Sequence, residues 1–305
     1  ARRQRQMCIR DSSRVGESWE LSGMPGSESV VAEGPWAGST LSELIGRFGA
    51  ELLGKANYAR FGQEFPLLVK FIDAREDLSI QVHPDDELAR KRHGKSGKCE
   101  MWYVLEAEPG ASLLTGFSRP IAPAEYERRV ADNTLTDVLN RQAIASGDVF
   151  YLPAGRVHSI GKGSFIVEIQ QSSDITYRIY DFDRRDAAGN SRELHTELAR
   201  EAIDFESSEN SRITYAPENN QEVRLVTTPY FTTSLYTLTA RTRCDWSATD
   251  SFVAIVLLQG SGSLTDNEGN RIDVRQGETW LLPASTQWTE ITPHTAPLRL
   301  LTSRI

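Results

Sequence analysis

The chain has 305 residues, of which 39% are hydrophobic and 25% are charged, and its formal net charge is −8 at pH 7. Single hydrophobic cores stop growing at about 250–300 residues, so this length suits two core-forming units of an ordinary globular protein. The negative charge argues against nucleic acid as a partner. No run approaches the ~20 apolar residues of a membrane span, so we expect no membrane partner.

The opening segment, residues 1–14, is basic and polar and has no apolar run, so it lacks the pattern of a secretory signal. It resembles translated adapter sequence as much as a disordered arm, and we treat it as an atypical tail without function. The three cysteines, Cys8, Cys99 and Cys244, lie far apart and form no CxxC pair. They indicate a reducing, cytoplasmic compartment. We expect a monomer or a weak homodimer.

The first regular element is a helix. Thr40 and Glu43 form a capping-box pattern, and apolar residues follow at helical spacing as far as Leu52. The pattern predicts a helix that ends near Gly54.

From Phe65 to Tyr180 the chain consists of short β-rich runs separated by Gly, Pro, Asp and Ser, which is typical of an all-β region. Helical patterns interrupt it at 123–143 and follow it at 191–205. β-rich runs resume near Val223. We therefore predict a mainly β protein, built as two antiparallel sandwiches or barrels in tandem with a few inserted helices. The predicted domains are 15–205 and 206–305.

One turn occurs twice. Residues 147–158 read GDVFYLPAGRVH and residues 277–288 read GETWLLPASTQW, and corresponding residues are always 130 positions apart. His158 in the first copy corresponds to Trp288 in the second. We interpret the second β region as a degenerate copy of the first, in which the indole fills the space of an ion. The prediction is one metal ion per chain, near His158.

Four side chains of the first β region form a candidate metal site. Gln81 and His83 are two residues apart in a predicted strand and therefore point to the same side. Glu100 opens the next strand, and His158 follows the repeated turn. The set suits a borderline divalent ion, zinc first, with manganese, iron or cobalt as alternatives. Either histidine alone is more often a core or surface residue, but the combination favours a metal.

The repeated turn has the form G-x5-P-x-G-x2-H, which resembles the second conserved motif of the cupin superfamily, whose histidine binds metal. The stretches QVHPDDELA, GKCEMWYVL, LPAGRVHSIG and QSSDITYRIYDFDR, in this order, resemble the short bacterial form of type I mannose-6-phosphate isomerase. The resemblance covers about 15–300. It implies two cupin-type jelly-roll barrels and a zinc enzyme that interconverts mannose 6-phosphate and fructose 6-phosphate through a cis-enediol.

The resemblance also implies roles for individual residues. The metal ligands would be Gln81, His83, Glu100 and His158. Arg178 falls on the active-site arginine of the family, Lys98 on a pocket lysine and Asp174 on a pocket aspartate, which makes all three catalytic candidates.

The chemistry needs a cation that stabilises the enediolate, and Arg178 suits this task because a guanidinium stays charged. The alternative for Arg178 is an ion pair with Asp181 or Asp183. The substrate phosphate has candidate contacts at Ser18, Lys98, Arg178 and Lys95, although Lys98 alone could equally be a solvated loop residue.

The general base stays open at the level of the sequence. The candidates are Asp174, Glu17, Glu20 and a histidine near the metal. Glu168 and Gln170 alternate along one strand and could face the same interior, but a structural role explains them equally well. Two other functions are compatible with the pattern: a metal cupin isomerase for another sugar, and a non-catalytic sugar-sensing cupin.

Overall fold

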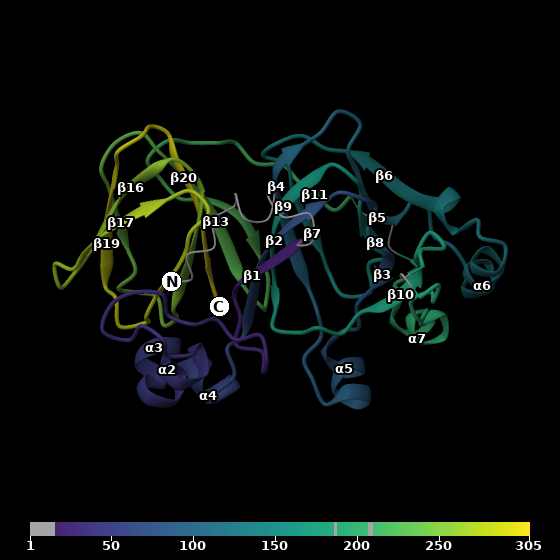
Figure 1. The fold of residues 1–305 in the computed structure, drawn as a ribbon, viewed down its shortest axis with the longest axis horizontal. Coiled ribbons are helices and arrows are strands. Elements are labelled where there is room, and N and C mark those ends of the chain that lie inside the picture. The colour runs from purple at the N-terminus through teal and green to yellow at the C-terminus, as the bar shows by residue number, and fades with distance from the viewer. Residues whose placement is uncertain (1–15, 186–187, 207–209) are drawn as a thin grey trace. The chain divides into compact units, whose positions relative to one another are not determined.

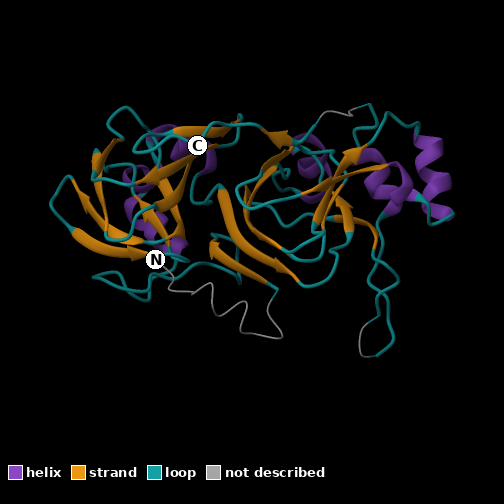
Figure 2. Ribbon diagram, turned by 90° about the horizontal axis from the view of Figure 1, so that it is seen from above, coloured by secondary structure: helices purple, strands orange, loops and turns teal. Residues whose placement is uncertain are grey.

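The computed structural model describes residues 16–185, 188–206 and 210–305. The predicted tail at 1–14 lies outside these residues. Strands dominate the described chain, and helices are few and short (Figure 2). The predicted mainly β class is therefore confirmed.

The described residues group into two compact units. Unit 2 comprises Ile72–Ile213, and unit 1 combines the described residues up to Phe71 with Thr214–Ile305. The predicted ranges, 15–205 and 206–305, placed the early residues with the first β region. In the structure, residues 50–56 instead bond to the second β region. Ala284 N donates to Leu52 O at 2.9 Å, and the Asp250 carboxylate accepts the amide of Lys55 at 2.7 Å.

The first β region contains two sheets, in the strand orders β1-β2-β9-β4-β7-β11 and β10-β3-β8-β5-β6 (Figure 1). A hydrophobic core lies between them and contains Trp102, Phe150 and Ile166 from one sheet and Leu113 and Ile160 from the other. The strands are β1 (Glu17–Leu21), β2 (Leu67–Ala74), β3 (Ile80–Val82), β4 (Glu100–Ala107), β5 (Ser112–Phe117), β6 (Leu139–Ala143), β7 (Val149–Leu152), β8 (His158–Ile160), β9 (Ser164–Gln171), β10 (Tyr177–Tyr180) and β11 (Arg212–Ile213).

The helices of unit 2 differ in part from the predicted segments. They are α5 (Asp86–His93), α6 (Pro123–Ala131), the 3-10 turn η1 (Leu135–Val138) and α7 (Thr196–Ala202). The predicted helical interruption ends before Leu139, where strand β6 begins. The charged residues 90–93 form the last turn of α5. That helix begins with a cap in which the Asp85 carboxylate accepts the amide of Leu88.

The second β region of unit 1 also forms two sheets, in the orders β12-β13-β20-β15-β18 and β14-β19-β16-β17. Its core takes Tyr236, Ile255 and Leu300 from the first sheet and Leu264 and Ile291 from the second. The strands are β12 (Val223–Thr227), β13 (Thr232–Leu238), β14 (Thr242–Asp245), β15 (Val253–Gln259), β16 (Ser261–Asp266), β17 (Arg271–Arg275), β18 (Thr279–Leu282), β19 (Trp288–Pro293) and β20 (Leu298–Arg304).

The predicted early helix is confirmed as α2 (Leu41–Phe48), followed by α3 (Ala50–Leu53) and α4 (Lys55–Phe61). Both bonds of the capping box are present, because Thr40 Oγ1 accepts the amide of Glu43 and the Glu43 carboxylate accepts the amide of Thr40. Among the described residues no helix has both the length and the apolar character needed to span a membrane.

The expectation that the Trp288 indole fills the interior of the second β region, in place of an ion, is wrong. In β19 the buried residues are Thr289 and Ile291, so their neighbour Trp288 points away from the interior and is only half-buried. The guanidinium of Arg243 lies 4.1 Å from the centroid of its ring. The side chain at the inward position is Thr289, whose hydroxyl accepts a hydrogen bond from the buried indole of Trp246 at 3.0 Å.

Candidate metal centre

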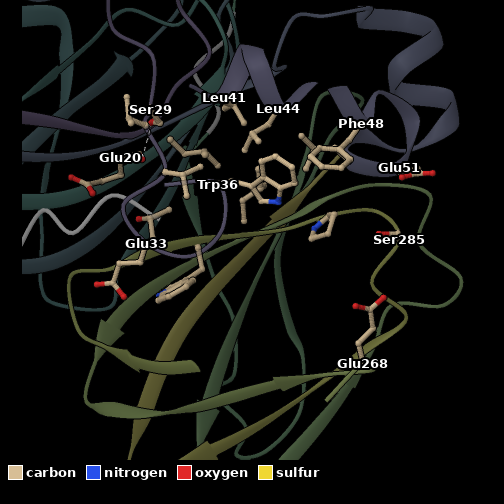
Figure 3. Close-up of a pocket in the computed structure, with 18 residues that line it drawn as sticks. Glu20, Ser29, Glu33, Trp36, Leu41, Leu44, Phe48, Glu51, Glu268 and Ser285 are labelled. Atoms are coloured by element: carbon tan, nitrogen blue, oxygen red, sulfur yellow. Dashed lines mark hydrogen bonds between the residues drawn. The ribbon is translucent and has the colours of Figure 1, made fainter. Parts of the chain in front are cut away.

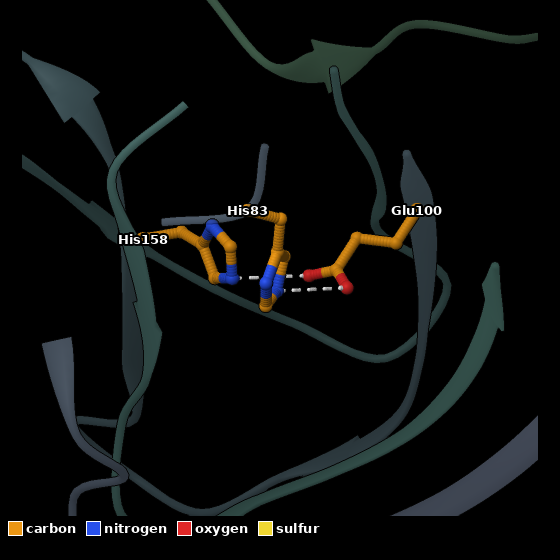
Figure 4. Close-up of side chains that lie close together, drawn as sticks. All are labelled: His83, Glu100 and His158. Carbon is orange, nitrogen blue, oxygen red and sulfur yellow. Dashed lines mark ion pairs between the residues drawn. The ribbon is translucent and has the colours of Figure 1, made fainter. Parts of the chain in front are cut away.

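Three predicted ligands meet inside unit 2. His83, Glu100 and His158 are all buried, and their ligand atoms lie within 4.8 Å of one another (Figure 4). His158 Nε2 is 3.1 Å from Glu100 Oε1, and His83 Nε2 is 3.5 Å from Glu100 Oε2. In the described part of the chain this is the one group of three or more such side chains that could hold a metal ion. The second β region contributes none of its described residues to such a group.

The repeated turn positions two of these ligands. Gly147 and Gly155 have φ angles of 90° and 84°, which side chains other than glycine rarely adopt. The amide of Gly155 donates to the carbonyl oxygen of His83 at 2.9 Å, so the turn is bonded directly to the segment that carries the first imidazole. His158 then begins β8 three residues later. The turn therefore connects the segments that carry His83 and His158, as its predicted role in a metal site requires.

Both imidazoles are oriented by backbone carbonyls. His83 Nδ1 lies 2.8 Å from Ile175 O, and His158 Nδ1 lies 2.8 Å from Arg156 O. Nδ1 must carry the proton to donate these bonds, which leaves the lone pair of each Nε2 facing Glu100. This is the tautomer that a metal ligand requires.

The charge states also suit a metal. Burial, reinforced by the charge of Lys98, lowers the pKa of His83 to about 4, and burial likewise lowers the pKa of His158. Burial by itself would raise the pKa of Glu100, but the charge of Lys98 and the interactions with His158 and His83 together outweigh it and hold that pKa well below the ordinary value. The centre therefore presents two neutral imidazoles and one carboxylate at neutral pH.

The donor set fits a borderline divalent ion. Both oxygens of Glu100 are buried and face the two Nε2 atoms and the ammonium of Lys98, so they lie where they could ligate a cation together with the imidazoles. Gln81 lies beside the cluster, with its amide nitrogen 3.3 Å from His158 Nε2. A half-turn of the amide about its last bond would bring the oxygen there instead, as a fourth ligand requires.

Lys98 is a buried part of the same centre. Its ammonium is 2.9 Å from Glu100 Oε2 and 3.1 Å from His83 Nε2, and its side chain is only 5% exposed. The alternative that Lys98 is a solvated loop lysine is therefore wrong. A buried ammonium beside the ligands can stabilise negative charge on a bound sugar.

The interior face of the sheet also carries Glu168 and Gln170. Trp102 stands opposite Glu168 and Glu100 stands opposite Gln170 in the β4–β9 pair, so all four side chains share one face. Trp102 Nε1 donates to Glu168 Oε2 at 2.9 Å, and Glu168 Oε1 is 3.9 Å from Lys98 Nζ. The alternating spacing signalled the shared face, but only the strand pairing places Glu168 beside Lys98.

Arg178 stands opposite Gln81 in the β10–β3 pair, so it shares a sheet face with that ligand candidate. It donates to Glu193 O at 2.9 Å, and its backbone amide donates to His195 Nδ1. Asp181 instead binds two other arginines, Arg184 and Arg192, which hold its pKa below the ordinary value although burial opposes this. Burial and the charge of Arg192 lower the pKa of Arg178.

The remaining predicted site residues lie elsewhere. Asp174 is 45% exposed and pairs with Lys95 at 2.8 Å on the surface of unit 2. Ser18 is buried on β1 in unit 1 and donates to Glu20. Glu17, also on β1, is exposed and accepts the indole N–H of Trp19 at 3.1 Å.

A mainly β unit that brings two imidazoles and a carboxylate together in its interior has the architecture of a cupin with a candidate metal site. Residues 3–114 match the family model "phosphomannose isomerase type I, catalytic domain". The chain is 34% identical over 273 residues to the mannose-6-phosphate isomerase of Streptococcus mutans, which covers 89% of this chain and 84% of that protein. It is 35% identical over 276 residues to the mannose-6-phosphate isomerase ManA of Bacillus subtilis, and this match covers 89% of this chain and 84% of that protein.

Solved structures agree. The crystal structure of the mannose 6-phosphate isomerase from Bacillus subtilis has a TM-score of 0.87 at 30% identity, over 98% of this chain and 95% of that chain. A putative mannosephosphate isomerase from Archaeoglobus fulgidus shares the fold, with a TM-score of 0.77 at 20% identity over 98% of this chain and 91% of that chain. The chain belongs to the type I phosphomannose isomerase family.

Proposed function

We propose that this protein is an aldose–ketose isomerase that interconverts mannose 6-phosphate and fructose 6-phosphate. The observation that carries the proposal is the buried cluster of His83, Glu100 and His158 with the ammonium of Lys98 against it. Relatives at about one-third identity over most of their length are named for this reaction.

Isomerisation moves a proton between C1 and C2 of the sugar through a cis-enediol, and negative charge develops on the adjoining oxygens. A divalent cation, for which we propose zinc at one per chain, would supply Lewis acidity toward those oxygens. Gln81, His83, Glu100 and His158 would hold it. Lys98 and Arg178 would stabilise the developing charge, because both cations lie on or beside the interior face.

The carboxylate best placed to move the proton is Glu168. It is 3% exposed, lies on the same sheet face as Glu100 and adjoins Lys98, whereas the predicted Asp174 is half exposed and paired with Lys95. Asp174 is then a residue of the outer rim. For the phosphate we propose Arg178 and Lys98, and Ser18 stays a prediction from the motif.

Cys99 and Cys244 are free and buried, which supports a reducing compartment, and we place the reaction in the cytoplasm. The expectation of a monomer or a weak homodimer stays a prediction.

The direct test is a coupled assay of fructose 6-phosphate formation from mannose 6-phosphate by zinc-loaded protein. Turnover is expected, with little or none for unphosphorylated mannose. Bound zinc without turnover of any hexose phosphate would exclude the isomerase and favour a sugar-sensing cupin. Turnover of a different hexose phosphate alone would favour an isomerase for another sugar.

Two variants separate the metal from the chemistry. His158→Ala is expected to lose both bound metal and activity, since it removes a ligand. Arg178→Ala is expected to retain metal and lose activity. A normal rate in Arg178→Ala would refute its role.

A further inference from the structure

Unit 1 contains a pocket whose lining includes none of the residues assigned to the proposed isomerase reaction. It has a volume of about 520 Å³, which is in the range of sites that bind ligands, and lies between the α2–α3 segment and strand β18 (Figure 3). Its apolar wall includes Trp36, Leu44, Phe48 and Trp280. Trp36 is 36% exposed, so part of this apolar wall is accessible to solvent.

The pocket follows the backbone edge of β18. Thr279, Trp280 and Leu281 all line it, although successive side chains of a strand point to opposite faces. A cavity that touches three consecutive residues must therefore meet the strand along its edge. β18 is the last strand of its sheet, because it pairs with β15 on one side and with no described strand on the other. Such an edge can accept a further strand.

A buried polar group also points to an occupant. Thr279 is 2% exposed, and its hydroxyl forms no hydrogen bond with any described residue. An unsatisfied buried hydroxyl costs about 1–3 kcal/mol, so a polar group entering the pocket would relieve that cost.

The titratable side chains that line the pocket are all acidic. Its titratable lining residues are Glu20, Glu33, Glu51 and Glu268, and no Lys, Arg or His lines it. Figure 3 shows Glu33, Glu51 and Glu268 around the apolar side chains. The guanidinium of Arg47 already lies 4.2 Å from the centroid of the Trp36 ring, so this indole accepts a cation on its face.

We propose that the edge of β18 and its pocket bind an extended segment of another polypeptide, in which apolar residues alternate with lysine or arginine. Main-chain hydrogen bonds to β18 would supply the pairing. Alternate side chains would enter the apolar pocket, and the intervening cations would meet the carboxylates.

The test uses the full chain and three fluorescein-labelled, end-capped peptides. KVKLKVKL has the proposed pattern, EVELEVEL reverses the charge, and KVKPKVKP loses main-chain donors at its prolines. Fluorescence anisotropy is expected to show binding of the first and at least tenfold weaker binding of the other two. Equal binding of all three, or binding of none, overturns the proposal.

Variants and hydrogen exchange locate the site. Glu33→Gln combined with Glu268→Gln is expected to weaken KVKLKVKL about tenfold, whereas the matched Asp137→Asn, a carboxylate 68% exposed outside the pocket, leaves binding unchanged. The peptide is expected to slow amide exchange in Thr279–Leu282. Protection confined to another segment would refute the assignment. Isomerase activity serves as the check that each variant is folded.

Discussion

At the scale of single residues, the chemistry of the metal centre depends on charges that the protein keeps out of water. Lys98 and Glu168 are both buried, and each has its partners within the interior: Glu100 and His83 for the ammonium, Trp102 for the carboxylate. Buried charges interact strongly because little water screens them, so small changes here have large effects.

Glu168→Gln tests the assignment of the proton-transferring group. It removes the negative charge but keeps the shape, and no ligand changes, so bound metal is expected to stay near the wild-type amount. The value of kcat is expected to fall about 100-fold or more, as general acid–base catalysis contributes. Metal content and steady-state kinetics measure this, with Trp102→Phe as a comparison that removes the N–H donor to Glu168 together with part of the buried ring. A wild-type kcat for Glu168→Gln would transfer the role to another residue.

At the scale of elements, the turn before β8 sets where His158 lies. A methyl group on Gly155 would come within 3.0 Å of Ala202 O, in addition to the strain of its φ angle of 84°. Gly269 has the same φ angle of 84°, but a methyl group there would meet nothing within 4 Å. Comparing substitutions at the two glycines therefore distinguishes the cost of backbone strain from the cost of steric contact.

Gly155→Ala is expected to destabilise the protein by more than Gly269→Ala, whose cost should be about 1–2 kcal/mol from the backbone alone. Because the turn carries His158, Gly155→Ala is also expected to weaken zinc binding, and Gly269→Ala is not. Urea unfolding and zinc titration measure the two effects. Equal costs for both variants would show that the contact with Ala202 is easily relieved.

Ion pairs of one buried carboxylate hold the segment after β10. Asp181 binds Arg184 and Arg192, and these bonds lower its pKa although burial acts in the opposite direction. A carboxylate whose pKa is lower in the folded protein stabilises the fold above its unfolded pKa, and this stabilisation disappears as the pH falls through the folded value.

Asp181→Asn is therefore expected to be less stable than the wild type near pH 7. The difference in stability between the two proteins should stay constant down to about pH 5. It should shrink below pH 4, because the ordinary pKa of Asp is about 3.9. Thermal unfolding at a series of pH values measures it. A difference that grew as the pH fell would contradict the direction of the pKa shift.

At the scale of the whole molecule, the described residues offer one metal centre in two similar β regions. The inward position that follows the second turn is Thr289, which is engaged by Trp246. Neither residue is a preferred ligand of a borderline divalent ion.

The purified protein is therefore expected to bind one zinc ion per chain. EDTA should abolish activity and lower Tm, and zinc at 100 times its Kd should restore about 2.7 kcal/mol of stability. Elemental analysis and differential scanning calorimetry measure these quantities. His158→Ala should show no shift of Tm with zinc, and two ions per chain would contradict the assignment to a single centre.

The sequence by itself determined the mainly β class, the α2 helix and the glycine turn, since a capping box, a strand alternation or a positive φ depends on a few neighbouring residues. It also predicted His83, Glu100 and His158 as candidate ligands, because ligand chemistry can be recognised from residue type and spacing, and the structure brings these three side chains together.

Only the tertiary structure decided what depends on distant strands. Pairing of β4 with β9 brought Glu168 to Lys98, and bonds from Ala284 and Asp250 joined the early helices to the second β region. The alternation of β19 turned Trp288 outward. A strand has two faces, and which one becomes the interior is determined by the sheet that packs against it, since a shift of one residue exchanges all its side chains.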